Sequence, residues 1–223
     1  MKTFENYVVG IANELAHAAA MAIADGSAEM PVPVFIYGKS GLGKTHLLEA
    51  VANEIRQRDP SCHVLFIQGD QLVQEAIQAT RIGTIDEYWE RFREVAVVLV
   101  DDVQFLERMV TIQEYLCETL WNKKRVILVG NCLPENLPGF GEVLKNYFKT
   151  CFRVEIQPPD YDNRVAIIKS IAARKKVELP EEVITYVAEN VTDGRLICRV
   201  LDKFLACLDL LSGDMDNENF LPN

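Results

Sequence analysis

Hydrophobic runs of membrane-spanning length are absent from this sequence of 223 residues. No apolar stretch approaches the ~20 residues that a helix needs to cross a bilayer. The opening residues, MKTFE, contain no hydrophobic core of the kind that directs secretion. These absences argue against export and against a membrane partner, and we expect a cytoplasmic protein.

The sequence also lacks closely spaced pairs of cysteines. The six cysteines lie at positions 62, 117, 132, 151, 198 and 207, and none of them forms a C-x-x-C motif. Most of them lie among apolar residues, as Cys62 does shortly before Val64, Leu65 and Phe66. This usage excludes a disulfide framework and predicts buried free thiols in a reducing compartment.

Basic residues are scarce. The chain has 23 Lys and Arg against 33 Asp and Glu, which gives a net charge of −10 at pH 7. Proteins that hold DNA by its phosphates use clustered Lys and Arg, whereas the longest basic run here covers residues 174–176. That run is expected to cap a helix or to line a solvated face. The overall charge therefore disfavours DNA binding by the chain as a whole. Contact with DNA through a local basic patch stays open as an alternative.

What the sequence does contain is a complete phosphate-binding loop, GKSGLGKT, at residues 38–45. Its glycines let successive N–H groups point into one concavity that a phosphate fills. Lys44 supplies a positive charge for the β- and γ-phosphates of ATP, and the Thr45 hydroxyl can ligate Mg²⁺. The residues expected to contact ATP or ADP here are Gly38, Gly41, Leu42, Gly43, Lys44, Thr45 and His46.

Short apolar runs alternate with helical patterns through most of the chain. Consecutive apolar positions are typical of parallel strands covered on both faces. The predicted strands are 34–37, 64–67, 95–100, 126–129 and 152–156. The predicted helices between and before them are 11–24, 45–57, 72–81, 85–94 and 112–121. This order predicts a three-layer α/β/α domain with a five-stranded parallel sheet.

The pattern changes at Pro158 and Pro159, which cannot continue a strand ladder and stiffen the chain. No strand signal follows; helical patterns cover 163–175, 180–190 and 195–211. We therefore expect an α/β/α domain over residues 1–157 and a small α-helical lid domain over residues 158–223. The polar residues 212–223 are expected to fray.

Asp101 and Asp102 end the apolar run at residues 97–100. They are expected at the carboxyl edge of the sheet, where open α/β sheets bind ligands. Two acids that merely end a strand are the alternative, but the phosphate loop upstream favours a metal site. Asp101 is expected to hold Mg²⁺ and Asp102 to orient or activate the attacking water. Aspartate is shorter than the glutamate that many NTPases carry at the second position, which predicts slow ATP hydrolysis.

These motifs resemble the AAA+ domain of the bacterial DnaA replication initiators, over about residues 3–211. The resemblance is carried by FENYVVG at 4–10, Asn13, AHAAA at 16–20, the phosphate loop, DDVQFL at 101–106 and QPPD at 157–160. It implies an AAA+ nucleotide-binding core followed by a helical lid.

The resemblance also implies further site residues. Val8, Val9, Gly10 and Asn13 would line the adenine and ribose pocket. Arg195, in the lid, would reach the γ-phosphate, and Asn131 would polarise the water or the γ-phosphate.

The chain departs from the family at three places. Tyr147 stands where the initiators carry an arginine that completes a neighbour's site, so Tyr147→Arg is expected to raise turnover. Gln78, Met109 and Thr111 replace basic residues that serve single-strand binding on the helical pair 71–93 and after it. No helix-turn-helix domain follows the lid, which indicates either an excised domain or a stand-alone paralogue of the Hda type.

Three functions follow as alternatives. The first is an ATP-dependent switch, with slow Mg²⁺-dependent hydrolysis, that contacts the replication initiator or the helicase machinery. The second is the ATPase core of an initiator that self-associates on origin DNA and melts it. The third is a helicase-loader-type ATPase, which would carry a more basic surface.

Overall fold

The computed structural model describes residues 2–26, 33–121, 123, 125–137 and 139–215, with side chains as far as Cys207. The chain divides into two compact units, Met1–Gln157 and Pro158–Asn223. Within the described residues, no helix is both long enough and apolar enough to cross a membrane.

The first unit is built on a parallel sheet with the strand order β2-β3-β4-β1-β5. Its strands are β1 (Val34–Tyr37), β2 (Val64–Gln68), β3 (Val97–Asp101), β4 (Arg125–Gly130) and β5 (Phe152–Glu155). Every residue of β3 is buried, as the continuous apolar run predicted. The five-stranded parallel sheet expected from the sequence is confirmed.

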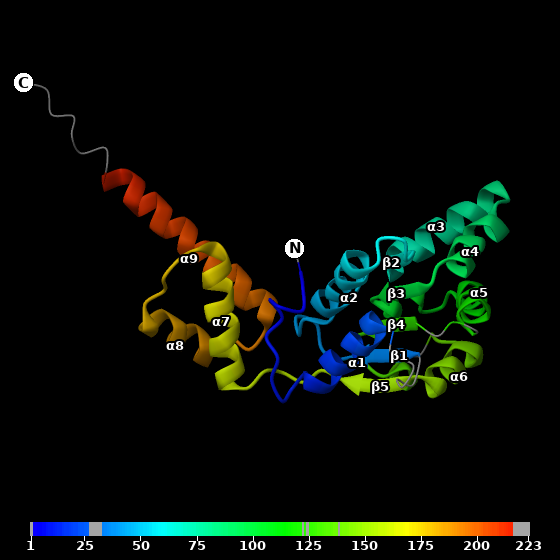
Figure 1. The fold of residues 1–223 in the computed structure, drawn as a ribbon, viewed down its shortest axis with the longest axis horizontal. Coiled ribbons are helices and arrows are strands. Elements are labelled where there is room, and N and C mark those ends of the chain that lie inside the picture. The colour runs from blue at the N-terminus through cyan, green and yellow to red at the C-terminus, as the bar shows by residue number, and fades with distance from the viewer. Residues whose placement is uncertain (1, 27–32, 122, 124, 138, 216–223) are drawn as a thin grey trace, which may run out of the picture. The chain divides into compact units, whose positions relative to one another are not determined.

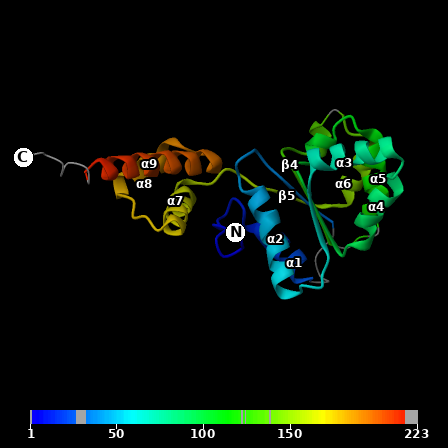
Figure 2. The same ribbon diagram turned by 90° about the horizontal axis from the view of Figure 1, so that it is seen from above.

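Helices cover both faces of the sheet (Figures 1 and 2). One face carries α1 (Glu14–Asp25) and α2 (Lys44–Arg58), whose apolar residues share a core with β1, β3, β4 and β5. The other face carries α3 (Gly69–Ile82), α4 (Ile85–Glu94), α5 (Val110–Leu120) and α6 (Glu142–Thr150). Short 3₁₀ turns, η1 (Val103–Leu106) and η2 (Pro134–Asn136), follow β3 and β4. The predicted three-layer arrangement is therefore observed.

Most element boundaries differ from the sequence prediction by one to three residues, and one helix was missed. Helix α1 begins at Glu14 rather than at residue 11, because the Asn13 side chain bonds the preceding turn. Strand β3 begins at Val97 rather than at residue 95, and it includes Asp101. Helix α6 was not predicted; it is nine residues long, and only Leu144, Tyr147 and Phe148 on it are buried.

The second unit consists of α7 (Tyr161–Lys175), α8 (Glu181–Asn190) and α9 (Gly194–Met215). Its small core contains residues from each helix: Ile168, Ile171, Ile184, Val187, Ala188, Ile197 and Leu201. Asp160 caps α7, since its Oδ1 accepts a hydrogen bond from the Asn163 N–H at 2.8 Å. Helix α9 continues through residues 212–215, where the polar composition of residues 212–223 predicts a frayed tail. Residues 216–223 of that tail lie outside the described residues.

Candidate nucleotide-binding site

The phosphate loop runs from the end of β1 to the start of α2. Gly38 has a φ of 152°, and a Cβ atom there would lie 2.4 Å from the carbonyl oxygen of Ile156. Gly43, the N-cap of α2, has a φ of 87°, and a Cβ there would lie 3.2 Å from the ring of Tyr7. Both positions therefore require glycine. The turn places the first N–H groups of α2 at the loop, and N–H groups at a helix N-terminus are suited to an anion.

Lys44 is the first residue of α2, and it is 6% exposed. Its Nζ donates hydrogen bonds to the carbonyl oxygens of Gly38 and Lys39, each at 2.7 Å. These contacts hold the ammonium group against the phosphate loop. The positive charge thus lies beside the backbone concavity that the motif predicted.

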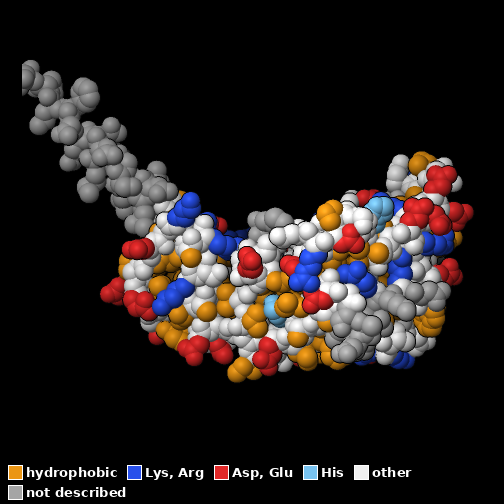
Figure 3. All heavy atoms as spheres, in the orientation of Figure 1, with side chains coloured by type: hydrophobic (Ala, Val, Ile, Leu, Met, Phe, Trp, Pro, Cys, Tyr) orange, Lys and Arg blue, Asp and Glu red, His pale blue; other side chains and the backbone are white. Residues whose placement is uncertain are grey.

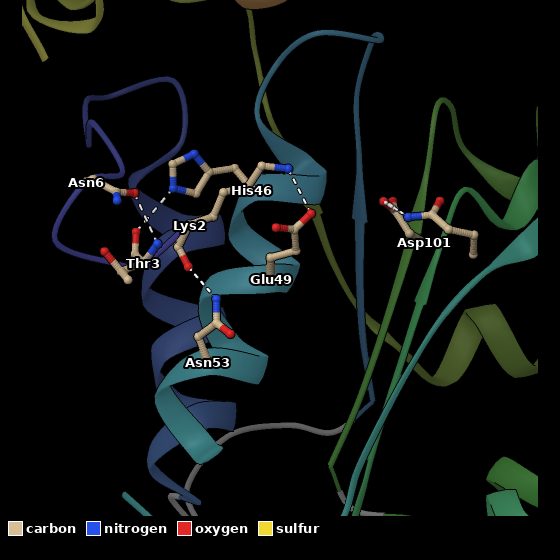
Figure 4. A network of polar contacts seen from close by, with 8 residues as sticks. Lys2, Thr3, Asn6, His46, Glu49, Asn53 and Asp101 are labelled. Carbon is tan, nitrogen blue, oxygen red and sulfur yellow. Dashed lines mark hydrogen bonds and ion pairs between the residues drawn. The ribbon is translucent and has the colours of Figure 1, made fainter. Parts of the chain in front are cut away.

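Asp101 is fully buried at the end of β3 (Figure 4). Its Oδ1 accepts a hydrogen bond from the Asp102 N–H at 3.0 Å, and its Oδ2 accepts one from Nε2 of Gln68 at 3.2 Å. Burial raises the pKa of this carboxyl, and the hydrogen bond with Thr45 opposes that rise. A desolvated carboxylate beside a hydroxyl is a donor set that suits a divalent cation.

Other protein ligands for a metal are not clustered here. No group of three or more His, Cys, Asp or Glu that could hold a metal occurs among the described residues. A cation beside Thr45 and Asp101 would therefore take its remaining ligands from phosphate oxygens and water. This is the usual coordination of Mg²⁺ in nucleotide sites.

Asp102 follows β3 in a left-handed conformation, with φ and ψ both at 52°. Nε2 of Gln104 donates to its Oδ1 at 2.8 Å. Its backbone carbonyl abuts the first residue of α3, because a Cβ atom at Gly69 would lie 2.4 Å from that oxygen. Strained backbone of this kind persists only where the surroundings fix it, and it is frequent at functional sites.

The segment before α1 is shaped by Asn13. Its Oδ1 accepts from the Gly10 N–H at 2.9 Å, and its Nδ2 donates to the Val8 carbonyl at 3.0 Å. Val9, between these two contacts, is 44% exposed. Asn13 therefore closes the turn that carries Val8, Val9 and Gly10, and its amide is engaged with the backbone.

Lys2 and Thr3, which precede that turn, contact side chains of α2 close to the phosphate loop (Figure 4). Lys2 forms an ion pair with Glu49 at 2.8 Å, and Nδ2 of Asn53 donates to the Lys2 carbonyl at 2.7 Å. Nε2 of His46 lies 3.2 Å from the Thr3 carbonyl oxygen. His46 thus connects the helix of the phosphate loop to the chain that leads to Val8.

Asn131 follows β4 and is exposed, while Cys132 is half-buried. Because β4 lies between β3 and β1 in a parallel sheet, Asn131 is at the same edge as Asp101 and the phosphate loop. Burial raises the pKa of the Cys132 thiol, as does the charge of Glu107.

Arg195 belongs to the second unit, where it is exposed in the first turn of α9. Oδ1 of Asp193 accepts hydrogen bonds from the Arg195 N–H at 2.7 Å and from the Leu196 N–H at 3.1 Å. The aspartate thus caps α9 and fixes the backbone from which Arg195 projects. The expected contact of Arg195 with a γ-phosphate stays a prediction.

Sequence reasoning missed three residues that shape this site. Gln68 ends β2 beside Asp101, and its polar side chain after four apolar residues was a usable signal. Gln104 lies within the DDVQFL motif, two residues after Asp102, and that close spacing is the signal for the hydrogen bond between their side chains. Tyr7 packs on Gly43, with its ring centroid 5.2 Å from that of His46; no local pattern indicates this contact.

Tyr147 lies in the core of the first unit, 2% exposed on α6. Its ring centroid is 6.2 Å from that of Trp121, and burial raises the pKa of its phenol. A side chain that points into the core cannot reach a neighbouring subunit. An arginine at this position would first have to be buried. The expectation that Tyr147→Arg completes a neighbour's site therefore stays a prediction, and burial makes lost stability its expected first effect.

A parallel sheet with a phosphate loop after β1 and an acidic pair at the end of β3, joined to a helical unit, defines a P-loop ATPase domain of the AAA+ type. The family model for the bacterial DnaA ATPase domain matches residues 1–155. The chain therefore belongs to the bacterial DnaA ATPase domain family, and the resemblance identified from the motifs is confirmed.

Relatives agree with this assignment. The chain is 32% identical to the chromosomal replication initiator protein DnaA of Thermoanaerobacter sp. strain X514 over 221 residues, which is 97% of this chain and 50% of that protein. It is 37% identical to DnaA of Pelobacter propionicus over 194 residues, which is 85% of this chain and 43% of that protein. The chain thus spans about half the length of the curated relatives it matches.

Solved structures agree as well. Domain III of the Thermotoga maritima replication initiation protein DnaA superposes with a TM-score of 0.89 at 33% identity, covering 95% of this chain and 90% of that one. A replication initiator DnaA bound to AMPPCP and single-stranded DNA superposes with a TM-score of 0.80 at 34% identity, covering 88% of this chain and 62% of that one. The expected AAA+ fold is therefore confirmed.

Proposed function

We propose that this chain binds ATP with Mg²⁺ at the carboxyl edge of the sheet. The observation that carries the proposal is the meeting of Lys44, Thr45 and the buried Asp101 beside a glycine-dependent loop. The loop N–H groups from Gly38 to Gly43 would hold the phosphates, Lys44 would add a positive charge, and Thr45 and Asp101 would hold the metal. The bound cation would neutralise charge on the phosphates.

The remaining nucleotide contacts extend this proposal. Val8, Val9 and Gly10 would line the base and ribose, in the conformation that Asn13 imposes on them. The exposed Asn131 would reach the γ-phosphate or the water from the sheet edge, and Arg195 would reach it from the helical unit. ADP would lose the contacts of Asn131 and Arg195, so the two nucleotides would bind with different conformational consequences.

Hydrolysis at this site is expected to be slow. Asp102 would orient the attacking water, but its carboxylate is short and already accepts a hydrogen bond from Gln104. Tyr147, which the resemblance matches to a catalytic arginine of the initiators, is buried and supplies no charge to a neighbour. Such an arginine accounts for several orders of magnitude in rate where it acts.

At the level of biology, we propose a nucleotide switch in DNA replication initiation or its control, acting through protein contacts. Family membership supports the process, and the net charge of −10 supports proteins over nucleic acid as partners. Components of the initiator or helicase machinery are the proposed partners. The alternative, an ATPase core that self-associates on origin DNA, is favoured by the related initiator whose structure contains AMPPCP and single-stranded DNA.

Light scattering with ATP, with ADP and without nucleotide separates the two accounts. For a switch, the mass should stay at one or two chains in every state, with slow turnover and no binding of oligo(dT) at low salt. ATP-specific growth into large assemblies, together with salt-sensitive oligo(dT) binding, would instead establish the DNA-assembling core.

Asp101→Asn is expected to separate metal binding from folding. Affinity for ATP in Mg²⁺ should fall at least ~10-fold, because a charged metal ligand is lost.

The same variant is expected to change the dependence of stability on pH. Burial raises the pKa of Asp101 in the folded state above its value in the unfolded chain. Ionisation of Asp101 therefore removes stability as pH rises through the interval between these two pKa values. The variant, free of Mg²⁺ and nucleotide, should therefore be more stable than the parent above that interval.

Thermal unfolding across pH and calorimetric titration of ATP with and without Mg²⁺ would measure both effects. Asp102→Asn is the control, and it should keep Mg²⁺-dependent binding while slowing hydrolysis. Equal loss of Mg²⁺-dependent binding in both variants would show that Asp101 has no special role at the metal.

A further inference from the structure

The helical pair α3–α4 carries a groove on the first unit. The groove has a volume of about 550 Å³. Its apolar lining includes Ala79, Ile82 and Tyr88, and its polar lining includes Gln78, Glu87 and Arg91. Ile82, at the end of α3, is 63% exposed, which is unusual for a side chain of this size.

Contacts between the two helices preform this groove. The Tyr88 hydroxyl donates to the Leu72 carbonyl at 3.1 Å, which fixes α4 to α3. On the other side of α4, Trp89 is fully buried and stacks on Tyr115 of α5 with centroids 5.9 Å apart. A groove between helices anchored in this way can accept a ligand without first being ordered.

The charges around the groove are acidic. The guanidinium of Arg91 pairs with Glu75 and lies 4.3 Å from the centroid of the Tyr88 ring, so its charge is compensated. Asp86 and Glu87, both exposed on α4, take part in none of the ion pairs formed by the described residues, and neither does Arg81, exposed on α3 next to Ile82. Two acids and one base are thus left without an ion pair at this end of the helical pair. Residues 69–94 hold six acidic and three basic side chains. Figure 3 shows acidic side chains gathered over the end of the unit that α3 and α4 form.

These charges do not suit a nucleic acid. Single strands are held by cations that follow the phosphates, together with aromatic faces on which bases stack. Arg91, the one arginine that lines the groove, is paired with Glu75. Its guanidinium covers the face of the Tyr88 ring on which a base could stack, and Gln78 supplies no charge. A polyanion would also approach Asp86 and Glu87, which repel it.

We propose that the α3–α4 groove is a docking site for a protein partner, specifically for an amphipathic helix with basic residues beside its apolar face. An apolar side chain of the partner would cover Ile82 and fill the groove, and Lys or Arg would pair with Glu87 and Asp86. This inference rests on the proposed action through protein contacts and names the surface that makes them.

The test uses the full chain, ¹⁵N-labelled, and two probes: an amphipathic Leu/Lys helical peptide and oligo(dT). The peptide is expected to shift the amides of α3 and α4. Ile82→Ser and Glu87→Lys should each weaken its binding at least ~10-fold, which corresponds to about 1.4 kcal/mol. The matched controls are Val143→Ser, at an exposed apolar position on α6, and Glu189→Lys, at an exposed acid on α8; both should bind the peptide as the parent does.

Three outcomes would overturn the docking site. Peptide shifts that map outside α3 and α4, or losses that are equal in the groove and control variants, would reduce the effect to general charge attraction. Oligo(dT) shifts confined to α3 and α4 and lost in Ile82→Ser would make the groove a nucleic-acid interface. The affinity for ATP, measured on the same variants, should equal that of the parent. If the parent chain itself does not bind ATP, the proposed function is refuted separately, because binding of the peptide does not require ATP.

Discussion

Lys44→Ala is expected to abolish measurable ATP binding while leaving the chain folded. The Lys44 ammonium lies against the phosphate loop through two 2.7 Å hydrogen bonds, and no other described side chain in the loop is a buried cation. Losing a charge-assisted contact costs about 1.5–3 kcal/mol, and here the single residue would contact two phosphates. Affinity should therefore fall by about 100-fold or more in calorimetric titration.

Lys39→Ala is the matched control for this experiment. Lys39 is an exposed lysine of the same loop, and only its backbone carbonyl contacts Lys44. Its removal changes the net charge equally and should alter ATP affinity by less than about threefold, as expected of an exposed charge. If both variants bind ATP like the parent, the loop is not the phosphate site.

Tyr147→Arg is expected to destabilise the first unit severely. Tyr147 is 2% exposed in a core formed with Phe148 and Leu144, so an arginine there would bury an uncompensated charge. Such a burial costs about 3–5 kcal/mol. For a chain of this size, that predicts a fall in the unfolding midpoint on the order of 10 °C.

Tyr147→Phe is the control, because it changes the same position without burying a charge. The Tyr147 hydroxyl has no hydrogen-bond partner among the described residues, so its removal leaves no group unsatisfied. The variant should be as stable as the parent or more stable by up to ~1 kcal/mol. A Tyr147→Arg chain with parental stability and faster ATP turnover would contradict this account and restore a surface role for the position.

The buried tyrosine and the acidic groove bear on the same question. An initiator that assembles through a neighbour's arginine needs that side chain at the surface. Tyr147, which the resemblance matches to that arginine, belongs to the core here. An initiator that holds single strands needs cations along the phosphates. The arginine that lines the groove between α3 and α4 is paired with Glu75, and Arg81 next to Ile82 is outnumbered by Asp86 and Glu87. Both features favour action through protein contacts.

Much of the site could be predicted from the sequence because its parts are local. The phosphate loop needs glycines at fixed offsets, and the positive φ angles at Gly38 and Gly43 bear out that requirement. Five apolar runs separated by helical patterns specify a parallel sheet, and β1 occupies its predicted range. Asp101 could be placed at the sheet edge because it ends an apolar run.

Other features depend on segments that are distant in the sequence. Gln68 bonds Asp101 only because β2 pairs with β3 in a particular register. Helix α6 is short and has three buried residues, so its periodicity alone gave too weak a signal for prediction. The environment of Asp102 depends on Gly69, whose contact with the Asp102 carbonyl arises where α3 starts.

The sequence by itself thus determined the family, the fold class and the residues suited to bind a nucleotide, since these follow from local spacing and backbone requirements. Only the tertiary structure decided that Tyr147 is buried, that Asp101 is desolvated and that α3 and α4 form a groove with Glu75, Glu87 and Arg91 in its lining. Exposure and charge environment are properties of packing. They arise from neighbours that periodicity along the chain does not identify.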